Sequence, residues 1–303
     1  MTWSRLRSYL AVVDNGSVRA AAVRLSVSES AISAAVAALQ AELGAVLLER
    51  SGRGLRVTEA GLVYADYARQ ILGLLDEGAA AAANGATPES GTLRLGAVPT
   101  AAEYLVPGLL ASFRRRYAEV ELTLEVGVRD HVHELLATHQ LDLVIGGRPP
   151  RGQGMVTRAM RRNALVVVAS PDLGLSGPDD VARATWLIRE PGSGTRDTTM
   201  ALLDGLEVRP PLLAMGSHGA VVASAVLGLG IALVSQDAVV RHLEAGELVL
   251  VPVRGTPLSR PWHAVTGGAP TATTRLFVRH LTDADAAGAL AFSTPAAARR
   301  PAG

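Results

Sequence analysis

Cysteine and lysine are both absent from the 303 residues, and aromatic side chains make up only 4% of them. Without cysteine the chain can form no disulfide, no thiolate metal site and no cysteine nucleophile. No apolar run reaches about 18 residues, which argues against a membrane-spanning helix. The start of the chain also lacks the long apolar stretch of a signal peptide, because Asp14 and Asn15 interrupt it. These absences lead us to expect a cytoplasmic protein with no membrane partner.

Motifs of the common enzyme classes are missing as well. The sequence contains no G-x-S-x-G, no P-loop, no H-E-x-x-H and no G-x-G-x-x-G after an apolar run. His131 and His133 form a close histidine pair, but a spacing of two on the helix expected there would point them to different faces. We therefore expect no catalytic residue, no cofactor and no metal site.

Short amphipathic helices are predicted in residues 1–60. Leu6, Leu10 and Val13 recur at helical spacing before a break at Asn15-Gly16. A second helix over 18–25 and a third over 29–43 follow, separated by a short turn and started by serine caps. After Gly44, two short apolar segments joined by residues 51–54 predict a hairpin. This order predicts a winged helix-turn-helix domain over residues 1–60.

About fifteen positions of this domain match one known family in order and spacing, within the strings GSVRAAA (16–22), SESAIS (28–33) and LRVTEAG (55–61). The domain resembles that of LysR-type transcriptional regulators. The resemblance implies a transcription regulator whose partner is double-stranded promoter DNA. The chain departs from the family where it has alanine at 34, 35, 37 and 38 in place of polar and basic residues, Gln40 in place of Glu, and Leu48 in place of Phe.

Base contacts would then fall on the serines of the third helix, and phosphate contacts on the arginines of the hairpin. These residues are Ser28, Ser30, Ser33, Arg50, Arg53 and Arg56. The alternative is that Ser28 and Ser30 only cap the helix and that the arginines are a solvated turn. Residues 1–60 hold seven arginines against five acidic residues, so charge alone would not have predicted a DNA-binding domain. We expect a modest affinity that depends on dimerisation and falls steeply with salt.

A long linker helix is predicted over residues 58–85, with Thr58 as its cap. Its small and apolar residues alternate spacings of three and four, as in a coiled-coil seam. They are Ala65, Ala68, Leu72, Leu75, Ala79 and Ala82. This seam favours a dimerisation helix, and the family resemblance implies a homodimer or homotetramer. Packing of the helix against its own domain is the alternative. A hinge rich in small residues follows over 86–91.

Residues 91–283 alternate apolar strands and helices, which predicts a parallel α/β sheet covered by helices. We expect subdomain I over 91–161 and 265–283, subdomain II over 162–264, and a disordered tail over 284–303. GTLRLG (91–96), LDLVI (141–145) and GLGI (228–231) resemble the family's effector-binding domain, a type 2 periplasmic-binding-protein-like fold. REPGSGTR (189–196) is similar to the subgroup that regulates Calvin-cycle and sulfur-assimilation genes.

Ligands of such sheets bind beyond the carboxyl ends of strands, near helix N-termini. Thr100 follows one strand, and a glycine- and hydroxyl-rich turn follows another, which favours a small anionic effector. The candidate residues are Thr100, Ser193, Gly194, Thr195, Arg196 and, beside the capping Ser217, His218. The alternative is that these segments are only turns and caps. Val98, where the family often has serine, removes part of the usual contact set.

Together these features predict a DNA-binding regulator whose promoter binding is modulated by a small anion between two subdomains. Two alternatives remain open. The first is a regulator of the same fold that acts without a ligand, and the second is a solute-binding module fused to an N-terminal domain.

Overall fold

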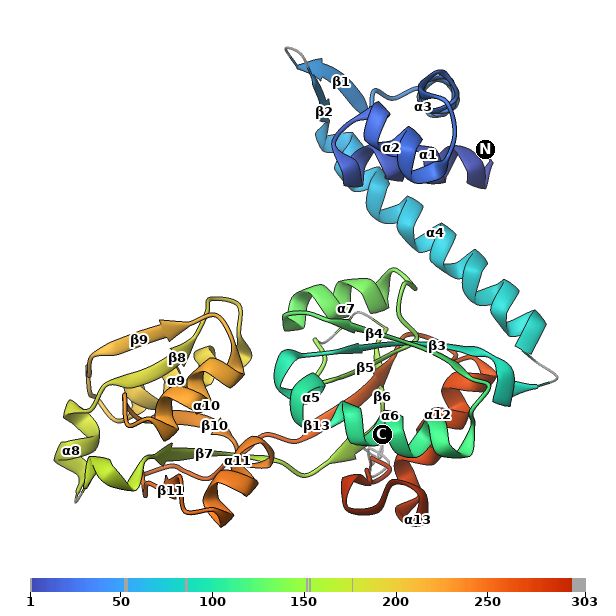
Figure 1. The fold of residues 1–303 in the computed structure, drawn as a ribbon. Coiled ribbons are helices and arrows are strands. Elements are labelled where there is room, and N and C mark those ends of the chain that lie inside the picture. Colours follow the sequence, from blue (N-terminus) through green and yellow to red (C-terminus); the bar gives the residue numbers. More distant parts are fainter. Residues whose placement is uncertain are drawn as a thin grey trace, which may run out of the picture. The chain divides into compact units, whose positions relative to one another are not determined.

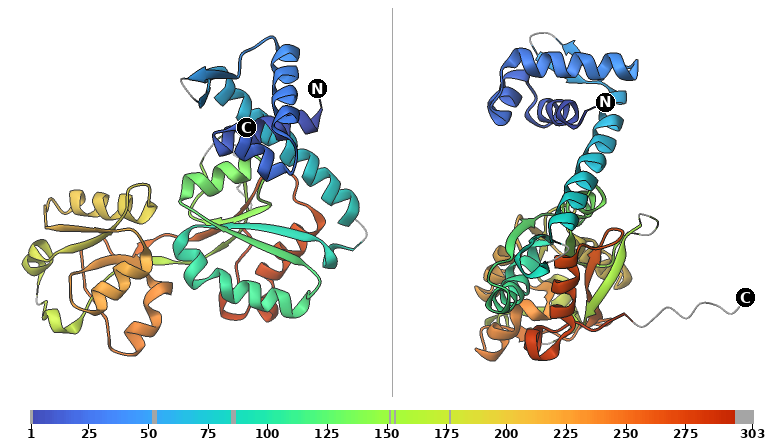
Figure 2. Two further views of the ribbon diagram at one scale, coloured as in Figure 1. Left: turned by 45° about the horizontal axis from the view of Figure 1, so that its top comes forward. Right: turned by 90° about the vertical axis from the view of Figure 1, so that its right-hand side faces the viewer.

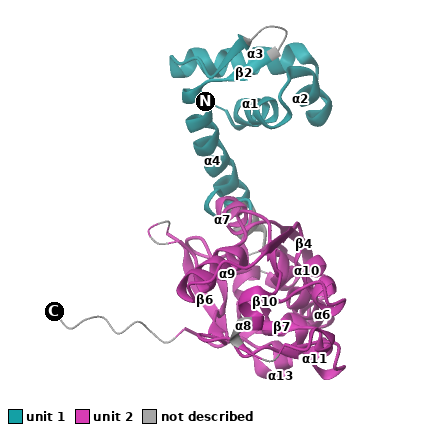
Figure 3. Cartoon of the chain, turned by 90° about the vertical axis from the view of Figure 1, so that its left-hand side faces the viewer, with its two compact units in different colours: residues 1–83, 137–140 teal, residues 84–136, 141–303 magenta. Residues whose placement is uncertain are grey.

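The computed structural model describes residues 2–51, 54–84, 87–150, 152, 154–175 and 177–295. The chain divides into two compact units (Figure 3). Unit 1 comprises residues 1–83 and 137–140, and unit 2 comprises residues 84–136 and 141–303. Unit 1 holds the first four helices and a hairpin, and unit 2 holds the larger sheets (Figure 1).

Three helices open unit 1: α1 (Trp3–Asn15), α2 (Val18–Leu25) and α3 (Glu29–Leu43). The hydroxyls of Ser17 and Ser28 cap α2 and α3 by accepting backbone N–H groups of the first turn. Gly16 and Gly44 end α1 and α3 in the left-handed conformation, with φ of 69° and 63°, which glycine adopts without strain. The expected helix-turn-helix is confirmed.

The hairpin pairs β1 (Leu48–Ser51) with β2 (Gly54–Val57) in antiparallel register. Arg53, at its tip, lies outside the described residues. The long helix α4 (Glu59–Asn84) follows directly. Thr58 caps it, because its Oγ1 accepts the Gly61 N–H at 3.0 Å. The bounds of α4 thus agree closely with the linker helix expected from the sequence.

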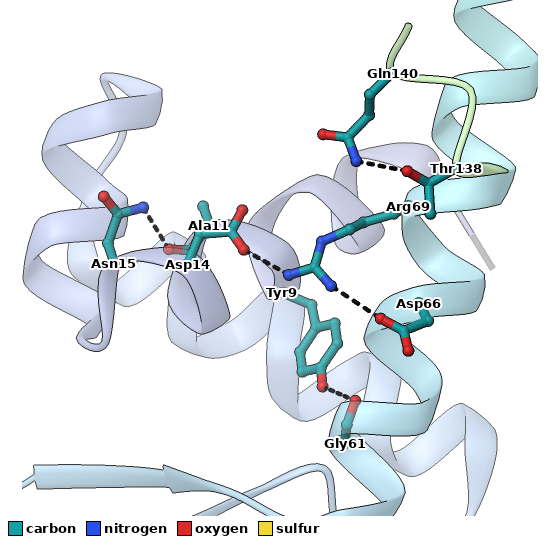
Figure 4. A network of polar contacts seen from close by, with 9 residues as sticks. All are labelled: Tyr9, Ala11, Asp14, Asn15, Gly61, Asp66, Arg69, Thr138 and Gln140. Carbon is teal, nitrogen blue, oxygen red and sulfur yellow. Dashed lines mark hydrogen bonds and ion pairs between the residues drawn. The ribbon is translucent and has the colours of Figure 1, made fainter. Parts of the chain in front are cut away.

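Polar contacts attach α4 to α1, and two of them are drawn in Figure 4. The buried Tyr9 hydroxyl donates a hydrogen bond to the carbonyl oxygen of Gly61 at 2.7 Å, and burial raises the pKa of Tyr9 to about 12. Arg69 donates to Asp14 of α1 at 2.8 Å and to Asp66 of its own helix at 3.1 Å. The start of α4 is therefore part of the folded domain and not only a connector.

The apolar residues of α4 lie on two faces. Ala65, Ala68 and Leu72 are buried in the core of unit 1 together with residues of α1, α2 and α3. The coiled-coil seam expected from the sequence is therefore wrong for these three residues, which pack against their own domain. The other three seam residues, Leu75, Ala79 and Ala82, are exposed, and for them the seam stays a prediction. On the opposite side of the helix, at helical spacing, four large apolar side chains are exposed: Val63, Tyr67, Ile71 and Leu74.

Among its described residues, unit 2 contains three sheets, which belong to two lobes visible in Figures 1 and 2. The strands of the first, subdomain I, are β3 (Thr92–Ala97), β4 (Glu121–Val126), β5 (Leu143–Gly146), β6 (Val156–Arg161) and β13 (Trp262–Thr266). Their order is β4-β3-β5-β13-β6. The helices of this lobe are α5 (Pro99–Tyr104), α6 (Val106–Arg116), α7 (Arg129–Ala137), α12 (Ala272–Thr282) and α13 (Ala284–Ala287). Leu143 and Ile145 of β5 face one core and Val144 the other, so β5 is buried on both faces.

The second lobe, subdomain II, is built around β7 (Ala164–Ala169). Its other strands are β8 (Trp186–Arg189), β9 (Leu212–Met215), β10 (Ala232–Ser235), β11 (Val249–Leu250) and β12 (Leu258–Ser259). β7 pairs antiparallel with β10, β11 and β12, while β8 and β9 pair parallel. Its helices are α8 (Pro178–Arg183), α9 (Gly194–Gly205), α10 (His218–Val226) and α11 (Gln236–Glu244). Short 3-10 turns lie at Pro88–Ser90, Pro171–Leu173 and Gly288–Leu290.

Three expectations need correction. The sheets are not all parallel, because β13 returns antiparallel to β5 and β6 in subdomain I, and β7 pairs antiparallel with its neighbours in subdomain II. Residues 262–264 belong to subdomain I, since all of β13 lies in its sheet. Residues 284–295 are ordered: they form α13 and a 3-10 turn, bury Phe292 in the core and pair Ser293 with Met160. Only 296–303 of the expected tail lie outside the described residues.

Among the described helices, none alone is long and apolar enough to cross a bilayer, and α2 with α3 meets that criterion only as a pair bent by 109°.

Candidate functional site

The exposed face of α3 carries mainly small side chains. Its outward residues in the first three turns include Ser30, Ala31, Ser33, Ala34 and Ala37. The hydroxyls of Ser28 and Ser30 hydrogen-bond each other at 2.9 Å, and Ser28 also caps the helix. Capping is thus part of the role of Ser28. A face of hydroxyl and methyl groups can approach base edges closely in a major groove, where it offers short donors and apolar contacts to thymine.

Gln40 holds the turn that leads from α3 to the hairpin. Its Oε1 accepts the backbone N–H groups of Leu47 at 2.7 Å and Leu48 at 2.9 Å. A glutamate, the residue that the family usually has here, would offer the same acceptor. This departure from the family pattern therefore preserves the local structure.

The hairpin arginines differ in their surroundings. Arg50 is exposed at the end of β1. Arg56 lies opposite Glu49 in the strand register and forms an ion pair with it. A phosphate contact by Arg56 would have to replace its ion pair with Glu49. Arg50 is therefore the better candidate for a phosphate contact.

We expect Arg50→Ala to reduce the slope of log affinity against log salt by about one, because one phosphate contact and its released counterion are lost. Arg56→Ala should change the slope by less than half as much. The measurement is a fluorescence-anisotropy titration with DNA from the promoter region next to the protein's own gene, at several salt concentrations. Equal slopes for both variants and the unmodified protein would contradict the assignment of Arg50.

A cavity of about 60 Å³ lies between the two lobes of unit 2. Subdomain I contributes Val98, Pro99, Thr100, Val128, Arg129, Gly147 and Trp262 to its lining. Subdomain II and the connecting segments contribute Asn163, Leu165, Arg189, Gly192, Ser193, Gly194, Thr195, Ser235 and Arg260. The lining therefore contains three arginines and no carboxylate.

Helix N-termini add to this positive potential. Ser193 and Ser235 are the N-caps of α9 and α11, yet neither side chain caps its helix, and both residues are buried in the cavity wall. Arg129, also in the wall, is the first residue of α7. The amide groups at such ends carry partial positive charge and are donors without helical acceptors. This arrangement suits a small anion.

The three arginines are held in different ways. Arg129 donates to the adjacent Asp130 at 3.2 Å. Arg189 is only 4% exposed and donates two hydrogen bonds to Glu190, at 2.7 and 2.6 Å, which lowers the pKa of that carboxyl. Arg260 donates to the hydroxyl of Thr198 on α9. Burial lowers the pKa of Arg260, and the like charge of Arg129 lowers it further. An anion in the cavity would relieve that repulsion.

Four of the six effector residues expected from the sequence line this one cavity: Thr100, Ser193, Gly194 and Thr195. Arg196 does not line it, because its guanidinium donates to the Arg189 carbonyl at 2.9 Å and so braces the end of β8. The expected place of Arg196 in the cavity is therefore wrong, and the arginines that line it are Arg129, Arg189 and Arg260. His218 is also outside the lining.

His218 is instead part of the contact between the lobes. It is 1% exposed, and its ring packs edge-on against Tyr104 of α5, with centroids 5.5 Å apart. Within the described residues neither ring nitrogen has a hydrogen-bond partner. Burial, helped by the charge of Arg189, lowers the pKa of His218 to about 4, so the ring is neutral at pH 7. The structure therefore places His218 in a packing contact outside the lining of the cavity.

Sequence reasoning missed Arg129, Arg189 and Arg260. A signal existed for Arg189, which ends the strand directly before the glycine-rich turn. Arg129 could have been found as the first residue of a helix that follows a strand. Arg260 carried no such signal, because only the folded chain brings the segment before β13 into the cavity. Within the described ranges, no group of three histidine, aspartate or glutamate side chains is placed to hold a metal ion.

Comparison with known proteins covers nearly the whole chain. Residues 3–62 match the family model described as bacterial regulatory helix-turn-helix protein, lysR family, and residues 86–286 match the LysR substrate binding domain. The chain is 34% identical over 272 residues to the HTH-type transcriptional regulator CbbR of Xanthobacter flavus, covering 87% of this chain and 81% of that one. It is 34% identical over 268 residues to a RuBisCO operon transcriptional regulator of Allochromatium vinosum, covering 86% and 88%.

A solved structure of a regulatory domain is similar to part of this chain. The regulatory domain of CcmR from Synechocystis PCC6803, in complex with 2-PG, superposes with a TM-score of 0.57 at 27% identity. The match covers 62% of this chain and 94% of that one.

Proposed function

This chain belongs to the LysR family of DNA-binding transcriptional regulators, which are not enzymes, and from that premise we propose that a small anionic metabolite in the cavity of unit 2 modulates its sequence-specific binding to promoter DNA. The observation that carries the proposal is the lining of that cavity, with three arginines and no carboxylate. As a regulator of promoters, the protein would act in the cytoplasm.

The chemistry of the cavity favours an anion over a neutral or cationic ligand. The charges of Arg129 and Arg260 repel each other, and a cation in the cavity would add to that repulsion. Arg129 also donates to Asp130 and Arg189 to Glu190, so part of the positive charge at the cavity is already balanced by carboxylates outside its lining. Hydrogen bonds from charged donors to an anionic oxygen are about twice as strong as neutral ones. Thr100 and Ser193 are buried residues of the cavity lining, and their hydroxyls complete the set of donors. The similar domain of CcmR is in complex with 2-PG, which makes 2-PG a reasonable first probe.

A regulator that acts without a ligand is the second candidate, and one observation favours it. The cavity of about 60 Å³ is smaller than the several hundred Å³ of typical metabolite sites. The solute-binding alternative fails to account for unit 1, which matches the DNA-binding model of the family.

Calorimetric titration of the full chain with 2-PG and with inorganic pyrophosphate tests the proposal, followed by promoter titrations with and without each compound. We expect one of them to bind and to change the DNA affinity. If a wider panel of small phosphorylated and carboxylic acids also fails to bind, the ligand-independent regulator is the better interpretation.

Self-association is part of the proposal. Helix-turn-helix proteins commonly bind two half-sites as dimers. The exposed row of Val63, Tyr67, Ile71 and Leu74 on α4 offers a continuous apolar strip on a helix of 26 residues, and the opposite face is already used by its own domain. A second copy of the same helix would cover this strip.

We expect the double variant Tyr67→Asp and Leu74→Asp to be monomeric in light scattering, because two charges would be buried without partners in the helix pair. The control is Tyr67→Phe with Leu74→Met, which keeps the apolar area and should keep the oligomer. An unchanged mass for the aspartate variant would rule out this face as the dimer contact. Leu72 is unsuitable for the test, since it is buried in the core of unit 1.

A further inference from the structure

Arg260 occupies a special place in the chain, at the second connection between the two lobes. It follows β12, which pairs with β7 in subdomain II, and it precedes β13, which lies in the sheet of subdomain I. The first connection, between β6 and β7, contains Asn163. Any change in the angle between the lobes requires backbone movement in these two short segments.

Hydrogen bonds between Arg260 and Asn163 join the two connections. The N–H of Arg260 donates to the carbonyl oxygen of Asn163 at 2.9 Å, and the side-chain amide of Asn163 donates to the carbonyl oxygen of Arg260 at 3.0 Å. The Asn163 side chain in turn accepts a hydrogen bond from Ser235, the first residue before α11, at 2.8 Å. The main chain of Arg260 is therefore fixed to both connections and to the start of a helix.

The side chain of Arg260 extends from its backbone, which is hydrogen-bonded to Asn163, into the cavity. Its guanidinium donates to Thr198 of α9. A Cβ atom on Gly194 would lie 2.6 Å from its Nη2, and one on Gly147 would lie 3.9 Å from the same atom. Gly194 begins α9 in subdomain II and Gly147 follows β5 in subdomain I, so the guanidinium lies between glycines of the two lobes.

We propose that Arg260 is the positioning residue that transmits occupancy of the cavity to the angle between the two lobes. This inference rests on the proposed function, namely that the cavity binds an anion. A bound anion attracts the guanidinium more strongly than the neutral Thr198 hydroxyl does, because hydrogen bonds between charged groups are stronger. The guanidinium leaves Thr198, and the displacement passes through the backbone pair with Asn163 to both connections.

Arg189 is a useful comparison, because it lines the same cavity but does not lie on a connection between the lobes. Its side chain also lines the cavity, but its backbone lies at the end of β8 within subdomain II, and its guanidinium is held by the neighbouring Glu190. An anion bound to Arg189 alone would change contacts within subdomain II and would not affect the angle between the lobes. Loss of Arg189 should therefore weaken binding, and loss of Arg260 should uncouple binding from movement.

The test measures the distance between the lobes in the full chain. Since the protein has no cysteine, spin labels can be placed at Glu119→Cys in subdomain I and Glu244→Cys in subdomain II, both exposed, with labelled chains diluted in unlabelled protein. Pulsed electron-electron double resonance then measures the distance between the two labels, with and without saturating 2-PG or inorganic pyrophosphate. Calorimetry reports the affinity of each variant for the same compounds.

In the unmodified sequence we expect a shift in the label distance at saturation. Arg260→Gln should still bind the probes, with an affinity about 10- to 100-fold lower, but should show no shift at saturation. Thr198→Val, which removes the acceptor of the guanidinium and keeps the side-chain shape, should move the probe-free distance part of the way towards the bound one.

The outcomes are distinguishable. A full shift in Arg260→Gln would overturn the inference, and so would a complete loss of binding, which would make Arg260 only a ligand contact. Binding without any shift in the unmodified sequence would leave the anion site intact and overturn the role of Arg260. If neither probe nor a wider panel of small anions binds the unmodified sequence, the proposed function itself fails, and this inference fails with it.

Discussion

Replacing Arg189 with glutamine is expected to weaken the binding of 2-PG or inorganic pyrophosphate by about 100-fold, the loss of roughly one or two charge-assisted hydrogen bonds. Arg189 is 4% exposed in the cavity wall, and its charge is screened little by water there. The substitution also leaves the Glu190 carboxylate without its partner near the site, which adds repulsion against an anion. Isothermal titration calorimetry of the full chain measures the change.

The matched control is Arg241→Gln. Arg241 is an exposed residue of α11 in the same lobe, and its removal changes the net charge by the same amount without touching the cavity. It should leave the affinity within about twofold, because exposed charges are screened over about 10 Å. Equal losses in both variants would mean that the effect comes from overall charge, which would contradict the assignment of the site.

A methyl group on Gly61 is expected to destabilise unit 1 by about 3 kcal/mol and to abolish promoter binding. A Cβ at this position would lie 2.2 Å from the carbonyl oxygen of Leu47 and 2.8 Å from Cγ1 of Val57, so the backbone that leads into the hairpin would have to move. The same shift would disturb the Gly61 carbonyl that accepts the Tyr9 hydroxyl. Alanine favours a helix over glycine by about 1 kcal/mol, which is too little to offset the overlap.

Gly78→Ala serves as the control for Gly61→Ala, because it lies in the same helix and a Cβ there would meet no atom within 4 Å. It should be neutral or slightly stabilising. Hydrogen exchange of peptides from residues 1–60 and a promoter titration measure both variants in the full chain. If Gly61→Ala keeps the exchange protection of the unmodified protein, the close approach at Leu47 is not essential to the fold.

The N-terminal unit could be predicted well from local signals. Serine caps and glycine terminators specify helix ends without any tertiary information, and Ser17, Gly16 and Gly44 act as expected. The side of α4 that meets its own domain could not be predicted the same way. Alanine and leucine recur on both faces of that helix, so the pattern alone does not distinguish a core contact from a dimer contact.

The effector site shows a different limit. The small residues of the turn at Ser193 and Thr195 mark a place where backbone amides are accessible, and the structure puts them in the cavity wall. Arginine, however, is common on any surface of this lysine-free chain, so no local feature distinguishes Arg260 from an ordinary surface residue. Its position follows from long-range topology, because β13 returns to the first sheet and so places Arg260, two residues before that strand, at the cavity.

The most direct test of the account is the thermodynamic coupling between the cavity and the DNA-binding domain. The affinity for the promoter region next to the protein's own gene would be measured with and without saturating 2-PG or pyrophosphate, and the affinity for the anion with and without that DNA. The account predicts a change of about 5- to 150-fold, equal in both directions, because coupling free energies are reciprocal. An anion that binds tightly yet leaves the DNA affinity unchanged would contradict it.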